Sequence, residues 1–452
     1  MRTGGWITAP ARSCRCGGAP VRESEHLQDR YARLFRENPE ARARYIIFQV
    51  TEACNLCCTY CYQGAKTTNS MSFDVAKQLI DELLTDDPRT ASGCSSWDSP
   101  GVVLEFIGGE PLLKVELIDE ITDYFISRCI ELRHPWGTRY FINICTNGTL
   151  YFDPRFQEYI RKNIRHLSFN VTVDGNRELH DSCRLRPDGT GSYDSAIAAV
   201  KHWREHWNGY MGSKLTLSPD NLQYCAKAII DMIEFGYDDI HFNPVFEEGW
   251  TIEHARLYYQ ELKKLADYLI ENRTLDTHSI PPLNPRWGHP MRPEDNDNWC
   301  GGVGGHMLAV DYKGNLYPCL RYMETSLNGK QEPYTIGNIH EGFTRKDRLE
   351  CLNCITRRSQ SSDECFNCPI ASGCAWCSAY NYEVFGTPNA RATYTCAMHK
   401  ALSLALCYLW NMIYRQRGSD ERYSLDCPKE WALGIINEEE YDLLKSLSEK
   451  TE

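Results

Sequence analysis

Three cysteines stand close together just after an apolar, strand-like run at 46–50. Cys54, Cys58 and Cys61 have the spacing C-x3-C-x2-C. Three thiolates at this spacing can bind three corners of a [4Fe-4S] cube and leave the fourth iron open for a chelating ligand. Zinc is the alternative, although a structural zinc ion takes four ligands and this triplet supplies three. We interpret the neighbouring Cys57 as a non-ligand.

Cysteine usage and length narrow the class of protein. The chain has 452 residues, which suggests two or more domains, and its 22 cysteines are spread over a length far beyond that of a disulfide-stapled miniprotein. Residues 1–30 contain no apolar signal segment, so we expect a reducing, cytoplasmic environment that suits thiolates and clusters.

Charge and hydropathy exclude two kinds of partner. The formal net charge is -12, with both signs interspersed, which argues against a nucleic-acid groove. The longest apolar stretch, 401–414, is about half the length of a membrane span and is interpreted as a buried helix. We therefore expect neither nucleic acid nor membrane as a partner.

Short strand-like runs alternate with longer amphipathic runs between about residues 45 and 275. The expected strands are 46–50, 102–107, 140–145, 167–173, 214–217 and 239–245. The expected helices are 72–85, 114–132, 192–207, 219–235 and 251–271. Six strand-helix units predict an α/β fold with a parallel sheet, a partial (β/α)6 barrel similar to a TIM barrel.

The candidate functional residues follow the ends of these strands, where the loops of a parallel barrel converge. Gly108-Gly109-Glu110-Pro111 follows the second strand, Thr146-Asn147 the third and Asp174 the fourth. The two glycines permit a close backbone approach, and Glu110 provides a carboxylate suited to a substrate ammonium group. An ordinary β-turn is the alternative for this tetrapeptide.

The triplet, with Tyr60 before its last cysteine and Gly108 to Pro111 after the next strand, resembles the radical S-adenosylmethionine (SAM) superfamily. The resemblance implies that the open iron chelates the amino and carboxylate groups of SAM, which is split to a 5'-deoxyadenosyl radical. No catalytic side chain is assigned, because the radical comes from SAM.

The same resemblance implies which residues surround SAM. The backbone of the Gly-Gly-Glu-Pro turn would bind the methionine amino group of SAM. Arg184 would bind the methionine carboxylate, and Arg186 is the competing candidate for that role. Thr172 and Asp174 would contact the ribose. The complete expected set is Tyr60, Gly108, Gly109, Glu110, Pro111, Thr146, Asn147, Thr172, Asp174 and Arg184.

A second cysteine-rich region begins near residue 300 and resembles the SPASM extension of radical SAM enzymes that act on peptides. By resemblance, an outer auxiliary cluster would be bound by Cys365, Cys368, Cys374 and Cys396. An inner one would be bound by Cys300, Cys319 and Cys377. The inner cluster lacks a fourth ligand, for which His306, Cys351 or Cys354, and a substrate thiolate compete. Zinc is again the alternative for this region.

Local stretches around Cys319, Cys374 and Cys396 look most like maturases of cysteine-repeat peptides, including the ranthipeptide type. The resemblance implies thioether crosslinking of a ribosomally made precursor peptide with SAM, three [4Fe-4S] clusters and an electron donor such as flavodoxin or ferredoxin. The alternatives are sulfatase formylglycine formation, carbon-carbon crosslinking and epimerisation, and, more remotely, a non-catalytic metal-stapled binding protein.

The expected organisation is an N-terminal extension (1–44), a radical SAM barrel (45–275), a bridging segment (276–299), a SPASM domain (300–400) and a C-terminal helical segment (401–452). Glu247, Glu248 and Trp250 are candidates for lining the substrate site. The other thiols are expected to be small buried side chains: Cys94, Cys129, Cys145, Cys183, Cys225, Cys407 and Cys427.

Overall fold

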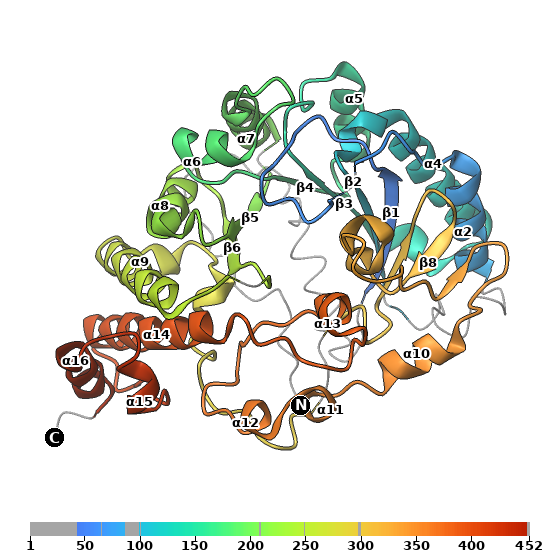
Figure 1. The fold of residues 1–452 in the computed structure, drawn as a ribbon. Helices are drawn as coiled ribbons and strands as arrows, with labels where there is room; N and C mark the ends of the chain where they lie inside the picture. The colour runs from blue at the N-terminus through green and yellow to red at the C-terminus, as the bar shows by residue number, and fades with distance from the viewer. Residues whose placement is uncertain are drawn as a thin grey trace.

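The computed structural model describes residues 43–64, 66–85, 99, 101–207, 209–247, 249–296 and 300–449. Its centre is a curved arrangement of strands with helices along the outside (Figure 1). The six expected strands are confirmed to within two residues at each end: β1 Arg44–Thr51, β2 Val102–Gly108, β3 Tyr140–Thr146, β4 Leu167–Val171, β5 Gly212–Leu217 and β6 Asp239–Pro244.

Helices connect successive strands and cover their outer side, as the alternation in the sequence predicts. They are α2 Phe73–Thr85, α4 Val115–Glu131, α5 Pro154–Asn163, α6 Arg177–Cys183, α7 Tyr193–Trp207, α8 Cys225–Glu234 and α9 Ile252–Glu271. The sequence analysis missed α5 and α6. The helix expected over 219–235 starts later, because a 3-10 turn at Leu222–Tyr224 precedes α8.

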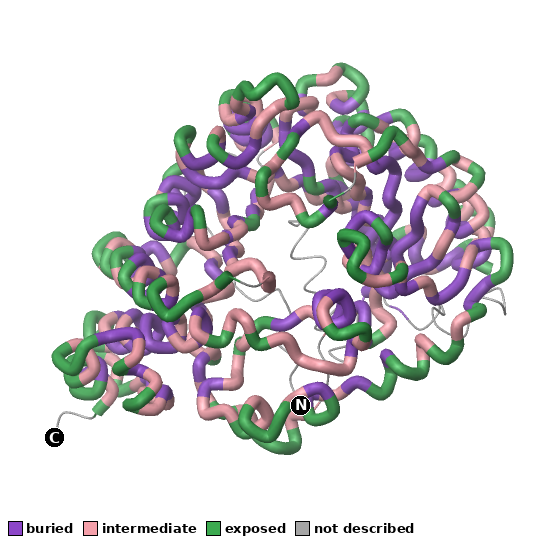
Figure 2. Tube along the Cα trace, viewed as in Figure 1, coloured by how far each residue is buried: buried purple, intermediate pink, exposed green. Residues whose placement is uncertain are grey.

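Burial along the strands shows which residues face the helices. In β4, Leu167, Phe169 and Val171 are buried, whereas Ser168 and Asn170 between them are only half-buried. Because side chains alternate across a strand, the apolar set packs under the helices and the polar set faces the inner side of the barrel. Figure 2 shows the same division, with buried backbone along the strands and exposed backbone on the outer helices.

The six strands do not form one continuous hydrogen-bonded sheet. β1 to β4 pair in parallel, and β5 pairs in parallel with β6 as a separate two-stranded sheet. Between them, a side chain replaces the backbone ladder: Asn170 Oδ1 accepts a hydrogen bond from the Gly212 amide at 3.1 Å. The barrel curvature is thus interrupted at a polar position on its inner side.

The cysteine-rich region is built into the main sheet. Strand β7 (Met307–Val310) pairs in parallel with β1, in the register Tyr45 to Met307 through Phe48 to Val310. The sheet continues through antiparallel β8 (Asn315–Tyr317) and β9 (Gly337–Asn338). β1 is therefore a central strand, which explains why six of its eight residues are buried.

Short helices follow this hairpin, and longer ones end the chain. They are α10 Lys346–Asn353, α11 Arg357–Gln360, α12 Asp363–Phe366, α13 Ser378–Phe385, α14 Cys396–Gln416, α15 Lys429–Ala432 and α16 Glu438–Ser448. Helix α14 packs along α9 and against α16, and this contact buries Leu404, Leu406 and Leu444. The apolar stretch 401–414 is thus confirmed as a buried helix.

Within the described ranges, no helix is both long and apolar enough to cross a membrane.

Candidate active site

The loop after β1 carries the cysteine triplet. The Leu56 amide donates to Cys54 Sγ at 3.4 Å, and the Cys61 amide donates to the Cys58 carbonyl at 3.3 Å. Cys58 lies within electrostatic reach of both other thiols and of Arg184. Burial raises the pKa of Cys58 to about 11, with Arg184 opposing. The thiol is therefore protonated until a metal ion displaces its proton.

Cys57 lies between two members of the triplet and is exposed, whereas the three triplet cysteines are half-buried. Its amide donates to the Leu185 carbonyl at 2.7 Å. The interpretation of Cys57 as a non-ligand stays a prediction.

The Gly-Gly-Glu-Pro turn packs directly on the triplet loop. The Gly109 amide donates to the Thr51 carbonyl at 3.1 Å, and the Glu110 amide to the Ala53 carbonyl at 2.9 Å. A Cβ at Gly109 would lie 2.4 Å from Ala53 O and 2.7 Å from Cys54 Cβ. Only glycine allows this approach, so the turn determines where Cys54 is placed.

The buried Glu110 carboxylate joins the turn to the loop after β3. Its Oε1 accepts from the Leu112 amide at 3.0 Å and from Thr146 Oγ1 at 2.6 Å, and its Oε2 accepts from the Asn147 amide at 2.9 Å. Asn147 Nδ2 in turn donates to Asn55 Oδ1 at 2.8 Å. These contacts hold three loops together, whereas the roles predicted for Glu110, Thr146 and Asn147 toward SAM remain predictions.

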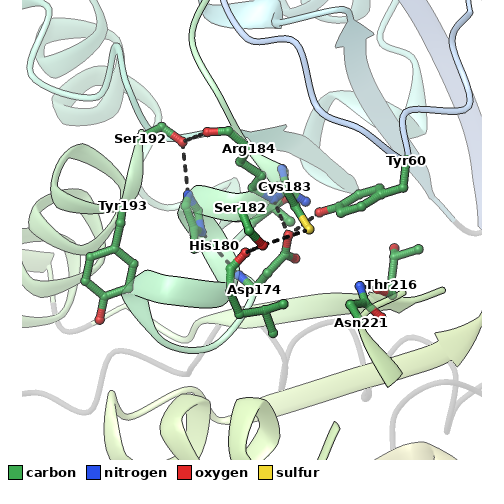
Figure 3. A network of polar contacts seen from close by, with 12 residues as sticks. Tyr60, Asp174, His180, Ser182, Cys183, Arg184, Ser192, Tyr193, Thr216 and Asn221 are labelled. Carbon is green, nitrogen blue, oxygen red and sulfur yellow. Dashed lines mark hydrogen bonds and ion pairs between the residues drawn. The ribbon is translucent and has the colours of Figure 1, made fainter. Parts of the chain in front are cut away.

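Tyr60, from the triplet loop, forms a buried network with Asp174 and Arg184 (Figure 3). Arg184 Nε donates to Asp174 Oδ2 at 2.8 Å, the Tyr60 hydroxyl bonds the same oxygen, and the guanidinium lies 5.4 Å from the Tyr60 ring centroid. Burial would lower the pKa of Arg184, but Asp174 outweighs it and raises that pKa. Arg186, the competing arginine, instead bonds the Gly191 carbonyl and Ser195.

His180 hydrogen-bonds to residues of this network, a role that the sequence analysis missed. Its Nδ1 accepts from the Asp174 amide at 3.3 Å, so its proton sits on Nε2, which faces Ser192 Oγ at 3.0 Å. The Ser192 hydroxyl donates to the Arg184 carbonyl at 2.7 Å. Burial and the Arg184 charge lower the pKa of His180 to about 4, with Asp174 opposing.

The same network offers a place for a ribose. Asp174 Oδ1 is buried and has no hydrogen-bond partner. An unpaired buried carboxylate oxygen is costly, and a ribose hydroxyl is a suitable donor to it. The residues present therefore fit the group that the sequence resemblance implies.

The second cysteine-rich region divides its thiols into the two expected sets. In the inner set, Cys319 lies within electrostatic reach of Cys300 and Cys377. In the outer set, Cys374 is close to Cys368 and Cys396, and Cys396 is also close to Cys365. Burial raises the pKa of Cys319, Cys374 and Cys377.

The arrangement of these thiols also bears on the zinc alternative. In the part of the chain that the structure describes, no three Cys, His, Asp or Glu side chains converge as they would around a single metal ion. The two alternatives differ in what they need, because a four-iron cluster takes its thiolates on separate irons whereas a structural zinc ion takes four ligands on one ion.

The candidates for the fourth inner ligand lie at different places. His306 is in the same turn as Cys300, and its amide donates to the Gly301 carbonyl at 3.0 Å. Cys351 and Cys354 are exposed on and just after α10, at the outer edge of the molecule (Figure 1). Cys351 lies against Tyr334.

One expectation about an individual residue needs correction. Cys145 is exposed on the inner side of β3, 3.6 Å from Thr172 Oγ1, because it falls on the polar side of the strand. Trp250 Nε1 donates to the Val245 carbonyl at 2.9 Å, and its role in lining the substrate site stays a prediction. Glu247 faces Arg321 at 3.4 Å, whereas Glu248 lies outside the described residues, as do Cys94 and the expected extension up to residue 42.

Comparison with known proteins identifies the class to which this fold and site belong. The model of the radical SAM superfamily matches residues 48–229. The AdoMet-dependent heme synthase of Methanosarcina barkeri is 31% identical over 367 residues, which cover 76% of this chain and 93% of that protein. The chain belongs to the radical SAM superfamily and is an oxidoreductase-type enzyme with a SPASM-type cysteine-rich region. Members of this family use SAM and a [4Fe-4S] cluster.

Other curated relatives share less identity. The serine-type anaerobic sulfatase-maturating enzyme of Bacteroides thetaiotaomicron is 27% identical, over 67% of this chain and 73% of that protein. The antilisterial bacteriocin subtilosin biosynthesis protein AlbA of Bacillus subtilis is 21% identical, over 73% of this chain and 66% of AlbA.

Solved structures show the same fold at lower identity. Native anSMEcpe with bound AdoMet and Cp18Cys peptide has a TM-score of 0.59 at 16% identity, covering 83% of this chain and all of that one. Streptococcus suis SuiB bound to precursor peptide SuiA has a TM-score of 0.51 at 14% identity, covering 81% of this chain and 78% of SuiB.

Proposed function

We propose that this enzyme installs sulfur-to-carbon thioether crosslinks in a ribosomally made, cysteine-containing precursor peptide. The inner cysteine set, Cys300, Cys319 and Cys377, carries this proposal. It supplies three thiols where a cluster has four irons, which leaves a position for the thiolate of a substrate cysteine. The full complement would be SAM with three [4Fe-4S] clusters, one at the triplet and two auxiliary, and a flavodoxin or ferredoxin as electron donor.

Cys54, Cys58 and Cys61 would hold the cluster, which together with bound SAM would supply the radical chemistry for hydrogen abstraction from the substrate. The residues of the chain orient the reactants. The close contact of Gly109 with the triplet loop determines the position of that loop. Glu110 holds the triplet loop against the loop after β3. Asp174 would bind the ribose of SAM, and Arg184 its carboxylate. Preorganised groups of this kind lower the entropic cost of bringing reactants together.

Two features of the relatives support a peptide substrate. The names of the Bacteroides thetaiotaomicron and Bacillus subtilis proteins refer to sulfatase maturation and bacteriocin biosynthesis. The anSMEcpe and SuiB structures contain a Cp18Cys peptide and the precursor peptide SuiA. The thioether itself is supported by the stretches around Cys319, Cys374 and Cys396, which resemble maturases of cysteine-repeat peptides.

The test is anaerobic turnover of cysteine-rich precursor peptides encoded near the gene, followed by mass measurement before and after alkylation with iodoacetamide. A thioether removes two hydrogens and also removes one alkylatable thiol. Formylglycine from serine and a carbon-carbon crosslink also remove two hydrogens but leave the thiol free, and epimerisation changes no mass. Loss of hydrogens with the thiol retained would contradict the thioether assignment.

The matched variant replaces Cys54, Cys58 and Cys61 with alanine. We expect this variant to lose SAM cleavage to 5'-deoxyadenosine. The auxiliary iron should remain, because the cysteines expected to bind it belong to other loops. Retained cleavage would contradict the role of the triplet.

Haem synthesis is a second candidate function. It is favoured by the AdoMet-dependent heme synthase of Methanosarcina barkeri, because the alignment with this chain covers 93% of that protein. Incubation with iron-coproporphyrin in place of peptide separates the two. Porphyrin turnover together with unmodified peptides would replace our proposal.

A further inference from the structure

The inner side of the barrel carries a lysine in the middle of a strand. Lys214 is exposed, whereas its neighbours in β5, Ser213 and Leu215, are buried. In the parallel register of β5 and β6, Lys214 lies beside His241, which is half-buried between the buried Ile240 and Phe242. Lys214 therefore projects away from the helices and toward solvent inside the barrel.

The charged groups near Lys214 place it beside the inner cysteine set. Among the described residues these groups are Cys377, Arg321 and, on β3 beyond β4, Cys145, and none of them is a carboxylate. None of these three neighbours belongs to the triplet loop. Although the side chain is accessible from inside the barrel, the protein around it partly desolvates the ammonium group, which lowers the pKa of Lys214.

Arg321 approaches the same place from the cysteine-rich region. Its guanidinium lies 5.1 Å from the ring centroid of Tyr62, which follows the triplet directly. It contacts Glu247 at 3.4 Å and Glu383 at 3.7 Å, and Glu383 is shared with Lys330 at 3.1 Å. Arg321 thus has carboxylate partners within the protein, whereas Lys214 has none among its charged neighbours.

We infer that Lys214, with Arg321 beside it, binds a carboxylate side chain of the substrate peptide and so selects an aspartate or glutamate next to the inner cysteine set. This inference rests on the proposed peptide substrate and narrows its class. Among the described residues Lys214 has no carboxylate partner, and a peptide carboxylate would give it a charge-assisted hydrogen bond in a partly desolvated place.

A substrate thiolate is the competing anion, and its charge state argues against it at Lys214. A free cysteine has a pKa of about 8.5 and is mostly neutral at neutral pH, whereas an aspartate, with a pKa of about 3.9, is fully charged. A carboxylate also offers two oxygens, so it can contact Lys214 and Arg321 together.

The test measures selection among peptide pools by the reconstituted, full-length protein with SAM. Each pool contains nonapeptides with one fixed cysteine and random small residues. One pool adds a single aspartate or glutamate, another asparagine or glutamine, and a third lysine. Retained peptides are quantified by mass spectrometry without reductant, so binding is read independently of turnover.

We expect about tenfold enrichment of the acidic pool over the amide pool, as one charge-assisted contact provides. Lys214→Met should abolish the preference, Lys214→Arg should retain it, and Lys214→Glu should shift it toward the lysine pool. Lys201→Glu, an exposed change on α7, is the matched control and should leave the preference intact. SAM affinity and iron content of each variant verify folding.

The outcomes separate this inference from the proposed thioether chemistry. No acidic preference, a preference that survives Lys214→Met, selection that follows the cysteine alone, or loss of SAM affinity in Lys214→Arg would each overturn the role of Lys214. Acidic selection without loss of hydrogens and thiol on turnover would leave the role of Lys214 intact and contradict the thioether proposal.

Discussion

Arg184 and Asp174 form a buried ion pair, Nε to Oδ2 at 2.8 Å, whose side chains are 11% and 0% exposed. The pair links the segment after α6 to the end of β4, and the Tyr60 hydroxyl joins it from the triplet loop. The triplet loop and the segment after β4 are therefore held by a single carboxylate oxygen.

Replacing Asp174 with asparagine leaves the Arg184 charge buried without its partner. We expect a loss of about 3 kcal/mol in the free energy of unfolding, as is typical for breaking one side of a buried pair, together with weaker SAM binding. Urea unfolding and calorimetry with SAM measure the two effects. The control is Asp194→Asn, which breaks an exposed pair with Arg177 and should leave both unchanged. Equal effects of the two substitutions would contradict the role of burial.

Gly109→Ala should disrupt the triplet site selectively. The added Cβ would lie within 2.6 Å of the Ala53 carbonyl group and 2.7 Å from Cys54 Cβ, so backbone must move. We expect iron content to fall by about four per chain and SAM cleavage to be lost, while auxiliary iron remains. Gly434→Ala, whose nearest contact would be 3.3 Å from Trp431 O, is the control. Full iron content in Gly109→Ala would contradict the proposed close approach.

His180 predicts sensitivity to mild acid. The pKa of His180 is about 4 in the folded protein against a reference value of 6.5. Between these two pH values the imidazole binds a proton in the unfolded chain but not in the folded protein. Stability from this residue is fully present above pH 6.5 and is lost as pH falls toward 4, by about 2 kcal/mol at pH 5. Urea unfolding at pH 7.5 and 5 should show a smaller loss for His180→Asn than for wild type. Equal losses would show that His180 is not responsible.

Iron analysis tests the two auxiliary sets. We expect about twelve irons per wild-type chain and about eight after alanine replaces Cys365, Cys368, Cys374 and Cys396. The control is Cys427→Ser, since Cys427 is buried within electrostatic reach of Cys368 and Cys396 but is not one of the expected ligands. A fall to about eight irons in that variant would make Cys427 a ligand, and zinc in place of iron would remove the auxiliary clusters.

Local patterns in the sequence predicted the strands and the residues that gather around the triplet. Short apolar runs mark the strands, and parallel barrels bring the following loops together, so Cys54, Glu110, Asn147 and Asp174 were expected to meet. The auxiliary cysteines lie near one another in the two groups that the SPASM resemblance implies, and their roles as ligands stay predictions.

Long-range pairing could not be predicted in the same way. Nothing local to Met307–Val310 indicates pairing with β1, and the replacement of a ladder bond by Asn170 depends on how β4 and β5 approach. Cys145 was expected to be buried because cysteine is usually apolar in behaviour, yet strand alternation places it inward. Lys214 falls within a predicted strand. Its charged neighbours Arg321 and Cys377 are far away in the sequence, so its surroundings could not be predicted from local patterns.

The pairing of β7 with β1 has a mechanical consequence. Because Met307–Val310 is hydrogen-bonded to the same strand that leads into Cys54, the inner cysteine set and the triplet are attached to opposite ends of one rigid ladder rather than to two bodies on a hinge. Their separation is then a constant of the fold. Any electron that passes between clusters at these sites would cross a fixed distance. A substrate that binds between them must fit that distance without movement of the two sites.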